Sequence, residues 1–217
     1  MTSQIGAAGR VRGEAKRDQL VAAALGEFLA HGYAGTSVDQ VAAAARASKR
    51  TVYAHFPDKE RMFREVIAST IEPMQRALQG QLDLLPADDP GEALRALINR
   101  LASLVVTPRV VQLRRLVIAE TDRFPDLAAE WYRLGPAQTI SRISKYLEAL
   151  LKAHRLRIDD TDEAAEELLW LSVSPALNRL LFQPSGTQVT PEELARTSSR
   201  AFDTFWLAHG PTDSSAH

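Results

Sequence analysis

The sequence lacks cysteine, long apolar runs and any sizeable net charge. Without cysteine the chain can form no disulfide and no thiolate zinc site, and it has no thiol nucleophile. No run of about 18 apolar residues occurs, and the first 19 residues carry four basic side chains without an apolar block. These features predict neither a membrane span nor a signal peptide. We therefore expect a cytoplasmic protein with no membrane partner, no cofactor and no metal site.

The near-zero net charge hides an uneven distribution along the chain. Residues 1–55 contain seven basic and four acidic side chains, which gives +3, whereas the remaining 19 basic and 23 acidic side chains give −4. A basic segment joined to a larger acidic one fits a protein whose first part alone contacts nucleic acid. Because the asymmetry is small, this interpretation also needs support from the local sequence.

Apolar residues recur with helical periodicity through most of the chain, and no alternating pattern predicts a strand. One helix start is well marked, because Asp89 is a cap candidate, Pro90 suits the first helical position and Glu92 completes a capping box. Pro73 is expected to kink or shorten its helix, and residues 135–136, Gly-Pro, to separate two helices. We predict an all-α protein of about nine helices, near 16–31, 38–45, 49–56, 59–78, 90–106, 109–134, 136–153, 161–183 and 191–208.

The first three predicted helices have the arrangement of a helix-turn-helix domain. The helices at 38–45 and 49–56 are both short and are joined by a tight turn, and the helix at 16–31 supports them. In such a motif the second of the two short helices enters the major groove of DNA.

The helix at 49–56 has side chains suited to that role. Lys49 and Arg50 offer donors to phosphates or guanine edges, while Val52 and Phe56 supply apolar anchors. Taken alone, a basic and aromatic octapeptide is more often a solvated surface helix. The helix-turn-helix context favours DNA contact.

The residues around these helices resemble the TetR/AcrR family of bacterial regulators, over about residues 15–63. The resemblance is carried by Leu29-Ala-His-Gly-Tyr, by Gly35-Thr-Ser-Val-Asp-Gln-Val-Ala and by Ser48-Lys-Arg-Thr-Val-Tyr-Ala-His-Phe-Pro-Asp-Lys-Glu. A looser similarity to the ligand domain of AefR-like members covers residues 113–158, including Arg-Phe-Pro-Asp-Leu at 123–127. The chain departs from the family at Arg46, where glycine is usual. A left-handed backbone there costs arginine roughly 1 kcal/mol or more.

The resemblance, together with two ends that lack helical periodicity, implies four segments in the chain. These are a flexible N-terminal tail at 1–14, a DNA-binding domain at 15–60, a helical ligand-binding and dimerisation domain at 61–209, and a flexible C-terminal tail at 210–217. It also implies a homodimer that binds a palindromic double-stranded operator and is released by a small, largely apolar effector of unknown identity. The positions that match DNA-facing residues of the family are Ser37, Ser48, Lys49, Arg50, Thr51, Tyr53, His55 and Lys59.

The second domain carries weaker signals. The helices at 161–183 and 191–208 have broad apolar surfaces, which suit either a four-helix dimer interface or an ordinary core. A ligand pocket would be lined by apolar and aromatic side chains with a few polar groups. Our candidates for its lining are Glu120, Phe124, Trp131, Tyr132, Tyr146, Trp170 and Asn178.

Two other classes of protein remain as alternatives. An enzyme would have to use the five histidines, which are far apart in sequence, and neither a His-Glu-x-x-His nor a phosphate-loop motif is present. We therefore expect no catalytic activity. A helical adaptor without DNA binding is the second alternative, and it would not need the helix at 49–56 to be basic.

Overall fold

The computed structural model describes residues 2–82 and 89–211, with the side chains of 2–12, 72, 74, 75 and 77–82 left out. The described chain is helical throughout, as predicted, and contains no strand. None of its helices is both long enough and apolar enough to span a bilayer. The elements are α1 (Thr2–Gly35), α2 (Val38–Ala44), α3 (Lys49–His55), α4 (Lys59–Leu82), α5 (Pro90–Val105), α6 (Pro108–Ala119), α7 (Pro125–Tyr132), the π-helical turn η1 (Arg133–Ala137), α8 (Gln138–Lys152), α9 (Thr161–Leu181) and α10 (Pro191–His209).

Helix α1 differs from the prediction at its N-terminal end. Its backbone is helical from Thr2, over the segment that we predicted as a tail, because each residue added to an existing helix gains a hydrogen bond without needing a buried face. At the other end Gly32 leaves the helical conformation (φ 70°, ψ 175°), which confirms the stop predicted there. Of the predicted C-terminal tail, Gly210 caps α10, and residues 212–217 lie outside the described residues.

The long helix predicted at 109–134 is wrong, because the structure has two helices there. Helix α6 ends at Ala119 and α7 begins at Pro125. Proline has no N–H and disfavours helical backbone in the residue before it, so it suits the first position of a new helix. The break predicted at 135–136 is instead the π-helical turn η1, through which the chain runs on into α8.

Two further predictions concern the proline inside α4 and the start of α5. Helix α4 continues through Pro73 to Leu82, so proline does not end it early. The predicted start of α5 is confirmed, because the Asp89 carboxylate accepts hydrogen bonds from the backbone amides of Gly91 and Glu92.

The chain forms two compact units. The first consists of Met1–Ile71 with Leu116–Ala128, and the second of Glu72–Arg115 with Ala129–His217. The first unit therefore takes in a segment that we had placed in the second domain. Helices α4, α6 and α7 each begin in one unit and end in the other.

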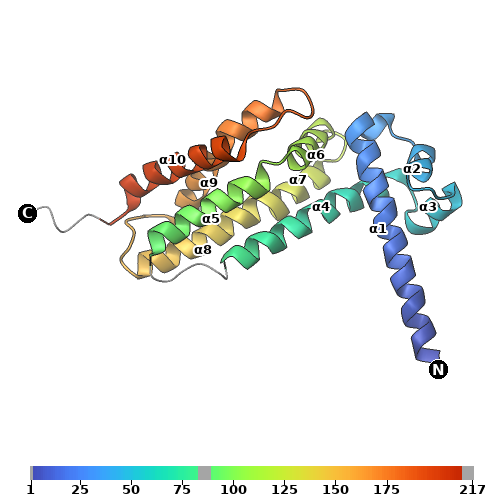
Figure 1. Cartoon of the computed structure of the whole chain (residues 1–217), viewed down its shortest axis with the longest axis horizontal. Coiled ribbons are helices and arrows are strands. Elements are labelled where there is room, and N and C mark those ends of the chain that lie inside the picture. The colour runs from blue at the N-terminus through green and yellow to red at the C-terminus, as the bar shows by residue number, and fades with distance from the viewer. Residues whose placement is uncertain (1, 83–88, 212–217) are drawn as a thin grey trace, which may run out of the picture. The chain divides into compact units, whose positions relative to one another are not determined.

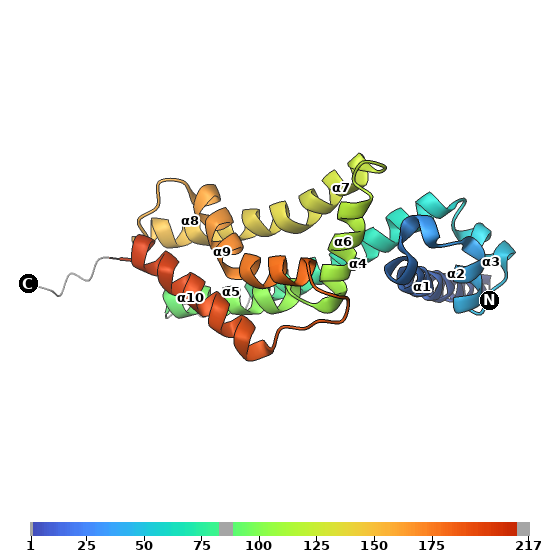
Figure 2. The same cartoon turned by 90° about the horizontal axis from the view of Figure 1, so that it is seen from above.

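In the first unit, α1 packs against α2 and α2 against α3, as Figures 1 and 2 show. Leu20, Phe28, Val41, Val52 and Phe63 have no more than 1% of their surface exposed. Burying an aliphatic or aromatic side chain of this size stabilises a fold by about 1.5–3 kcal/mol. The short helices are thus held by tertiary packing, since helices of two turns are not stable alone.

In the second unit, α5, α8, α9 and α10 surround one apolar core. They lie beside one another in both views (Figures 1 and 2). A polar contact links two of these helices, since the fully buried Ser198 hydroxyl donates to Asn99 Oδ1 at 2.5 Å. At Gly91, a Cβ atom would stand 3.0 Å from the Trp206 ring, so α5 and α10 approach closely only because glycine is there.

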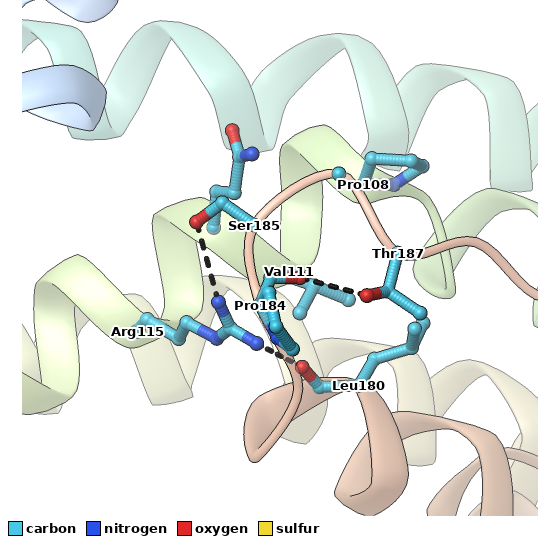
Figure 3. Close-up of a pocket in the computed structure, with 9 residues that line it drawn as sticks. Pro108, Val111, Arg115, Leu180, Pro184, Ser185 and Thr187 are labelled. Carbon is cyan, nitrogen blue, oxygen red and sulfur yellow. Dashed lines mark hydrogen bonds between the residues drawn. The ribbon is translucent and has the colours of Figure 1, made fainter.

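The C-terminal end of α9 is capped by a side chain from α6. Figure 3 shows the Arg115 guanidinium directed at this end, where it donates to the carbonyls of Leu180 and Gln183 and, at 3.5 Å, to the Ser185 hydroxyl. A cation at a helix C-terminus satisfies carbonyls that have no partner within the helix. The cavity beside it measures about 10 Å³, room for about one water molecule, so it is not a ligand pocket.

Candidate nucleic-acid interface

The turn between α2 and α3 is closed by two backbone hydrogen bonds. The amide of Arg46 donates to Ala43 and that of Ala47 donates to Ala42, at 3.0 and 2.9 Å. This 5→2 and 6→1 pattern is a Schellman motif, which needs a left-handed residue directly after the helix cap. Arg46 holds that position with φ 45°, so arginine here takes the left-handed backbone that glycine adopts more readily. The turn keeps the usual geometry despite the absence of glycine.

Helix α3 presents an apolar face inward and a polar face outward. Val52 and Phe56 are 1% and 3% exposed, which confirms them as the anchors of the helix. Arg50 is exposed and, within the described part of the chain, has no ion-pair partner, while Tyr53 is 46% exposed. A buried anchor on one side and free donors on the other are what a groove-entering helix requires.

Serine hydroxyls begin both short helices. Ser37 forms a capping box with Gln40, whose backbone amide donates to the serine hydroxyl at 3.2 Å. Ser48 accepts from the backbone amide of Thr51 and lies 2.8 Å from the Thr51 hydroxyl. Ser37 and Ser48 are exposed, so both capped helix N-termini lie at the surface of the protein. Both residues stay predicted DNA contacts.

Lys49 is already paired in the free protein. Its ammonium lies 2.9 Å from Asp39 Oδ2, and both side chains are more than half exposed. The hydrogen bond to this carboxylate raises the pKa of Lys49. A DNA phosphate or guanine would have to displace Asp39, an acidic neighbour that sequence reasoning did not connect with Lys49. In the sequence these two opposite charges are ten residues apart, and no helical spacing links them.

Lys59 has a structural role that the sequence did not suggest. Its ammonium donates to the carbonyls of Tyr33 and Thr36, both at 2.9 Å, and lies 4.4 Å from the centre of the Tyr33 ring. Two of its three donors are thereby occupied. Its contact with DNA stays a prediction, as does that of His55, whose half-buried ring packs beside Phe56.

The predicted ligand-binding residues are divided between the two units. Phe124 belongs to the first unit and packs there in its core, at 4.8 Å from Tyr33 and 5.7 Å from Phe63, measured between ring centres. Glu120 lies in the same unit, in the turn that precedes Phe124.

The other five candidates lie in the second unit and differ in burial. Trp131 is 8% exposed, and Tyr146 and Trp170 are half-buried against the core. Burial raises the pKa of Tyr146, and the nearby Asp89 carboxylate adds to the effect. Tyr132 and Asn178 are exposed, so neither has the enclosed position that a pocket-lining residue needs.

Arg114 is a polar group in the second unit that sequence reasoning missed. Its Nε atom is buried and has no hydrogen-bond partner within the described residues. Burial lowers the pKa of its guanidinium. Buried polar atoms are nearly always paired in proteins, and the Nε atom of the neighbouring Arg115 is likewise buried without a partner among the described residues. The available signal was an Arg-Arg pair between Leu113 and Leu116 in an otherwise apolar stretch.

Comparison with known proteins identifies both halves of the chain. Residues 20–66 match the family of bacterial regulatory proteins of the tetR family. Residues 92–211 match the C-terminal domain of AefR-like transcriptional repressors. The HTH-type transcriptional regulator TcmR of Streptomyces glaucescens is 34% identical over 122 residues, which cover 54% of this chain and 52% of TcmR. The match therefore spans about half the length of that curated relative.

Two solved structures are similar over almost their whole length. A TetR-family transcriptional regulator from Mesorhizobium loti is 30% identical, covers 92% of this chain and 98% of its own, and gives a TM-score of 0.84. The flavonoid-responsive regulator FrrA is 31% identical, covers 91% and 98%, and gives a TM-score of 0.67. With a helix-turn-helix in the first unit and an AefR-like helical domain behind it, the chain belongs to the TetR family of transcriptional regulators.

Proposed function

We propose that this regulator binds a palindromic operator as a homodimer and represses transcription until a small, largely apolar ligand releases it. The DNA-binding part rests on the two faces of α3. Val52 and the cap residue Phe56 are buried on one face. Arg50 and Tyr53 are exposed on the other face. The buried side chains hold the helix in place, while the guanidinium of Arg50 and the hydroxyl of Tyr53 stay accessible. Direct reading of base edges requires such accessible donors.

A dimer is needed because one helix of two turns reaches too few base pairs for useful specificity. In helix-turn-helix dimers the two recognition helices enter successive major grooves about 34 Å apart. The resulting operator is an inverted repeat. Binding should weaken steeply with salt, because phosphates neutralised by basic side chains release their counterions.

The operator can be found by selecting duplexes from a random DNA pool with the full-length protein. An enriched inverted repeat supports the proposal, whereas no enrichment would leave a helical adaptor as the better description. Arg50→Ala should relax the preference at one position of each half-site by about 1–3 kcal/mol. Tyr53→Phe should weaken binding to all sequences alike, since a single hydroxyl suits a phosphate. Arg155→Ala is the matched control, because Arg155 is exposed in the second unit.

The face of α9 and α10 supports the dimer. A groove of about 320 Å³ lies between these helices and is lined by Leu171, Pro175, Thr197, Arg200, Ala201 and Thr204. Leu171 of α9 is 38% exposed, Leu207 of α10 is 85% exposed, and Phe182, directly after α9, is 89% exposed. Large apolar side chains exposed on two neighbouring helices suit an interaction surface. Packing of two such helix pairs would form a four-helix interface.

We propose that the ligand binds at an apolar and aromatic site in the second unit, with Trp131, Tyr146 and Trp170 as candidate lining residues. Arg114 joins them as a donor for a carbonyl, phenolate or carboxylate group. Because the similar protein FrrA is flavonoid-responsive, polyphenols are the first class to test.

The test measures fluorescence anisotropy of the selected duplex while a panel of flavonoids, with naringenin and quercetin among them, is added. Release by one compound, weakened in Trp170→Ala but not in the surface variant Arg155→Ala, supports the sensor. A panel of long-chain fatty acids serves as the comparison class. If compounds of neither class lower the DNA affinity, the proposal that an apolar ligand releases the protein fails.

A further inference from the structure

Two neighbouring arginines of α6 differ in their surroundings. Arg115 donates to the carbonyls of Leu180 and Gln183 at the end of α9 and to the Ser185 hydroxyl (Figure 3). Arg114 forms no hydrogen bond and no ion pair with any residue that the structure describes. Both arginines have a buried, unpaired Nε atom, so the difference lies in the terminal nitrogens of the guanidinium. Arg115 is a helix cap, whereas the described residues give the charge of Arg114 no partner.

Arg114 stands on a side of α6 that faces the interior of the second unit. Leu113, directly before it, has none of its surface exposed. Val111 lies three positions earlier, on the same face of the helix, and is 4% exposed. Arg109, by contrast, is exposed near the start of the same helix. The half-buried Arg114 therefore places a positive charge beside apolar side chains of the second unit.

An unpaired guanidinium in this position is unfavourable. Arginine keeps its charge at every physiological pH, and a side chain that only packs its alkyl stem leaves the charged end in water. Here burial extends to the Nε atom and lowers the pKa of the Arg114 guanidinium, with no neighbouring carboxylate to offset the effect. Taking a charge out of water without a partner costs free energy. The second unit thus carries a positive charge that the described residues do not compensate.

Another half-buried arginine of the second unit shows how such a charge is usually compensated. Arg95 pairs with Glu92 at 3.1 Å and with Asp203 at 2.8 Å. Burial acts to lower the pKa of Arg95, but the two carboxylates outweigh it and raise the pKa overall. Arg114 has the burial without the carboxylates, so the group that would complete it is a carboxylate from outside the described chain.

A carboxylate suits Arg114 better than other acceptors do. The planar guanidinium presents parallel N–H groups that match the two oxygens of a carboxylate. A neutral carbonyl could accept a hydrogen bond but would leave the charge uncompensated, and a phenolate has only one oxygen. We infer that Arg114 binds the carboxylate of the effector, which is accordingly a small organic acid with an apolar body. The inference rests on the proposed function, in which a ligand binds in the second unit, and it narrows the class of that ligand.

Matched acids and amides test the charge directly. The probes are cinnamate with cinnamamide and decanoate with decanamide, so that the members of each pair differ in charge and hardly in shape. Binding to the full chain without DNA is followed by the fluorescence of the three tryptophans, which all lie in the second unit. In the wild type at least one acid should bind about tenfold or more tightly than its amide, because hydrogen bonds between charged groups are the stronger ones. If neither acid binds more tightly than its amide, the inference is overturned.

Three variants locate the preference for the acid. Arg114→Gln should abolish it, and Arg114→Lys, which keeps the charge but loses the planar fork, should retain part of it. Arg109→Gln is the matched control, because it removes an exposed arginine from the same helix, and it should keep the full preference. A preference that survives unchanged in Arg114→Gln would show that another group binds the acid.

The protein without ligand offers a second test. Arg114→Met replaces an uncompensated charge by an apolar side chain, so it should raise the urea midpoint for unfolding of the second unit, measured by tryptophan fluorescence. Arg109→Met should leave that midpoint nearly unchanged. A structural role like that of Arg115 predicts the opposite sign for Arg114→Met. A lowered midpoint would therefore overturn the inference, since it would mean that the charge already has a partner in the free protein.

The two proposals can fail separately. If an acid binds through Arg114 but leaves the selected duplex bound in anisotropy measurements, the proposed release by ligand fails while the role of Arg114 stands. If a compound releases the duplex equally well from the wild type and from Arg114→Gln, the proposed function stands and the inference about Arg114 is overturned.

Discussion

Replacing Arg46 by glycine tests whether the turn of the helix-turn-helix is strained by its sequence. Arg46 has φ 45°, a left-handed backbone that costs a residue with a side chain about 1–2 kcal/mol. Glycine removes this cost, but it has more freedom to lose on folding, by about 0.5–1 kcal/mol. We therefore expect Arg46→Gly to stabilise the first unit by about 0.5–1 kcal/mol.

A second variant separates the backbone from the side chain. Arg46→Ala removes the same guanidinium but keeps a Cβ atom in the left-handed region, so it should leave stability nearly unchanged. Both variants remove the same positive charge. If Arg46 neutralises a DNA phosphate, both should reduce the dependence of DNA affinity on salt equally, by a slope of about 0.9 for that phosphate.

The assay has to report on the first unit alone. Tryptophan fluorescence is unsuitable, because Trp131, Trp170 and Trp206 all belong to the second unit. Native-state hydrogen exchange of peptides covering 38–55 measures local opening of α2 and α3 directly. His154→Gly is the control, since His154 has φ 55° at the end of α8 and should change protection only there. Equal protection in Arg46→Gly and Arg46→Ala, or lower protection in Arg46→Gly than in the wild type, would refute the reasoning.

Three further predictions concern charged and apolar side chains elsewhere in the two units. Asp39→Asn should tighten DNA binding in anisotropy titrations, because it frees the Lys49 ammonium and removes a negative charge. Lys49→Ala should weaken DNA binding, and it should lower the slope of affinity against salt by about 0.9 if its ammonium neutralises one phosphate. Unchanged affinity in Asp39→Asn would show that the ion pair does not compete with DNA. The Arg64 guanidinium holds the pKa of Asp126 below its ordinary value of 3.8, so this group stabilises the folded state above that pH and the contribution disappears as the pH falls through the lower folded pKa. Acid unfolding of the first unit, followed by hydrogen exchange between about pH 5 and 2, should accordingly be less steep in Asp126→Asn, and an identical profile would contradict the sign. Leu171→Arg should shift sedimentation towards the monomer and abolish operator binding, whereas Ile118→Arg, at a side chain that is 58% exposed outside α9 and α10, should do neither.

The local arrangement of the first unit could be predicted from the sequence because its signals are short-range. Serine caps, a glycine stop and apolar residues at helical spacing lie within a few positions of one another, and they predicted α2 and α3 to within a residue. A tight turn between them could be predicted for the same reason, but its left-handed Arg46 could not, because arginine adopts that backbone much less readily than glycine.

Contacts between distant parts of the chain were decided by the tertiary structure alone. Phe124 is an aromatic residue in a stretch that resembles a ligand domain, and its sequence neighbours do not indicate that its ring packs on Tyr33 and Phe63 in the first unit. Arg64 and Asp126 are separated by 62 residues, so no periodicity links them. Likewise Lys49 and Lys59 look alike as basic residues near DNA-facing helices, but the fold places one beside Asp39 and the other on the carbonyls that end α1. Periodicity determines which face of a helix is buried, whereas the partner on that face depends on how the whole chain packs.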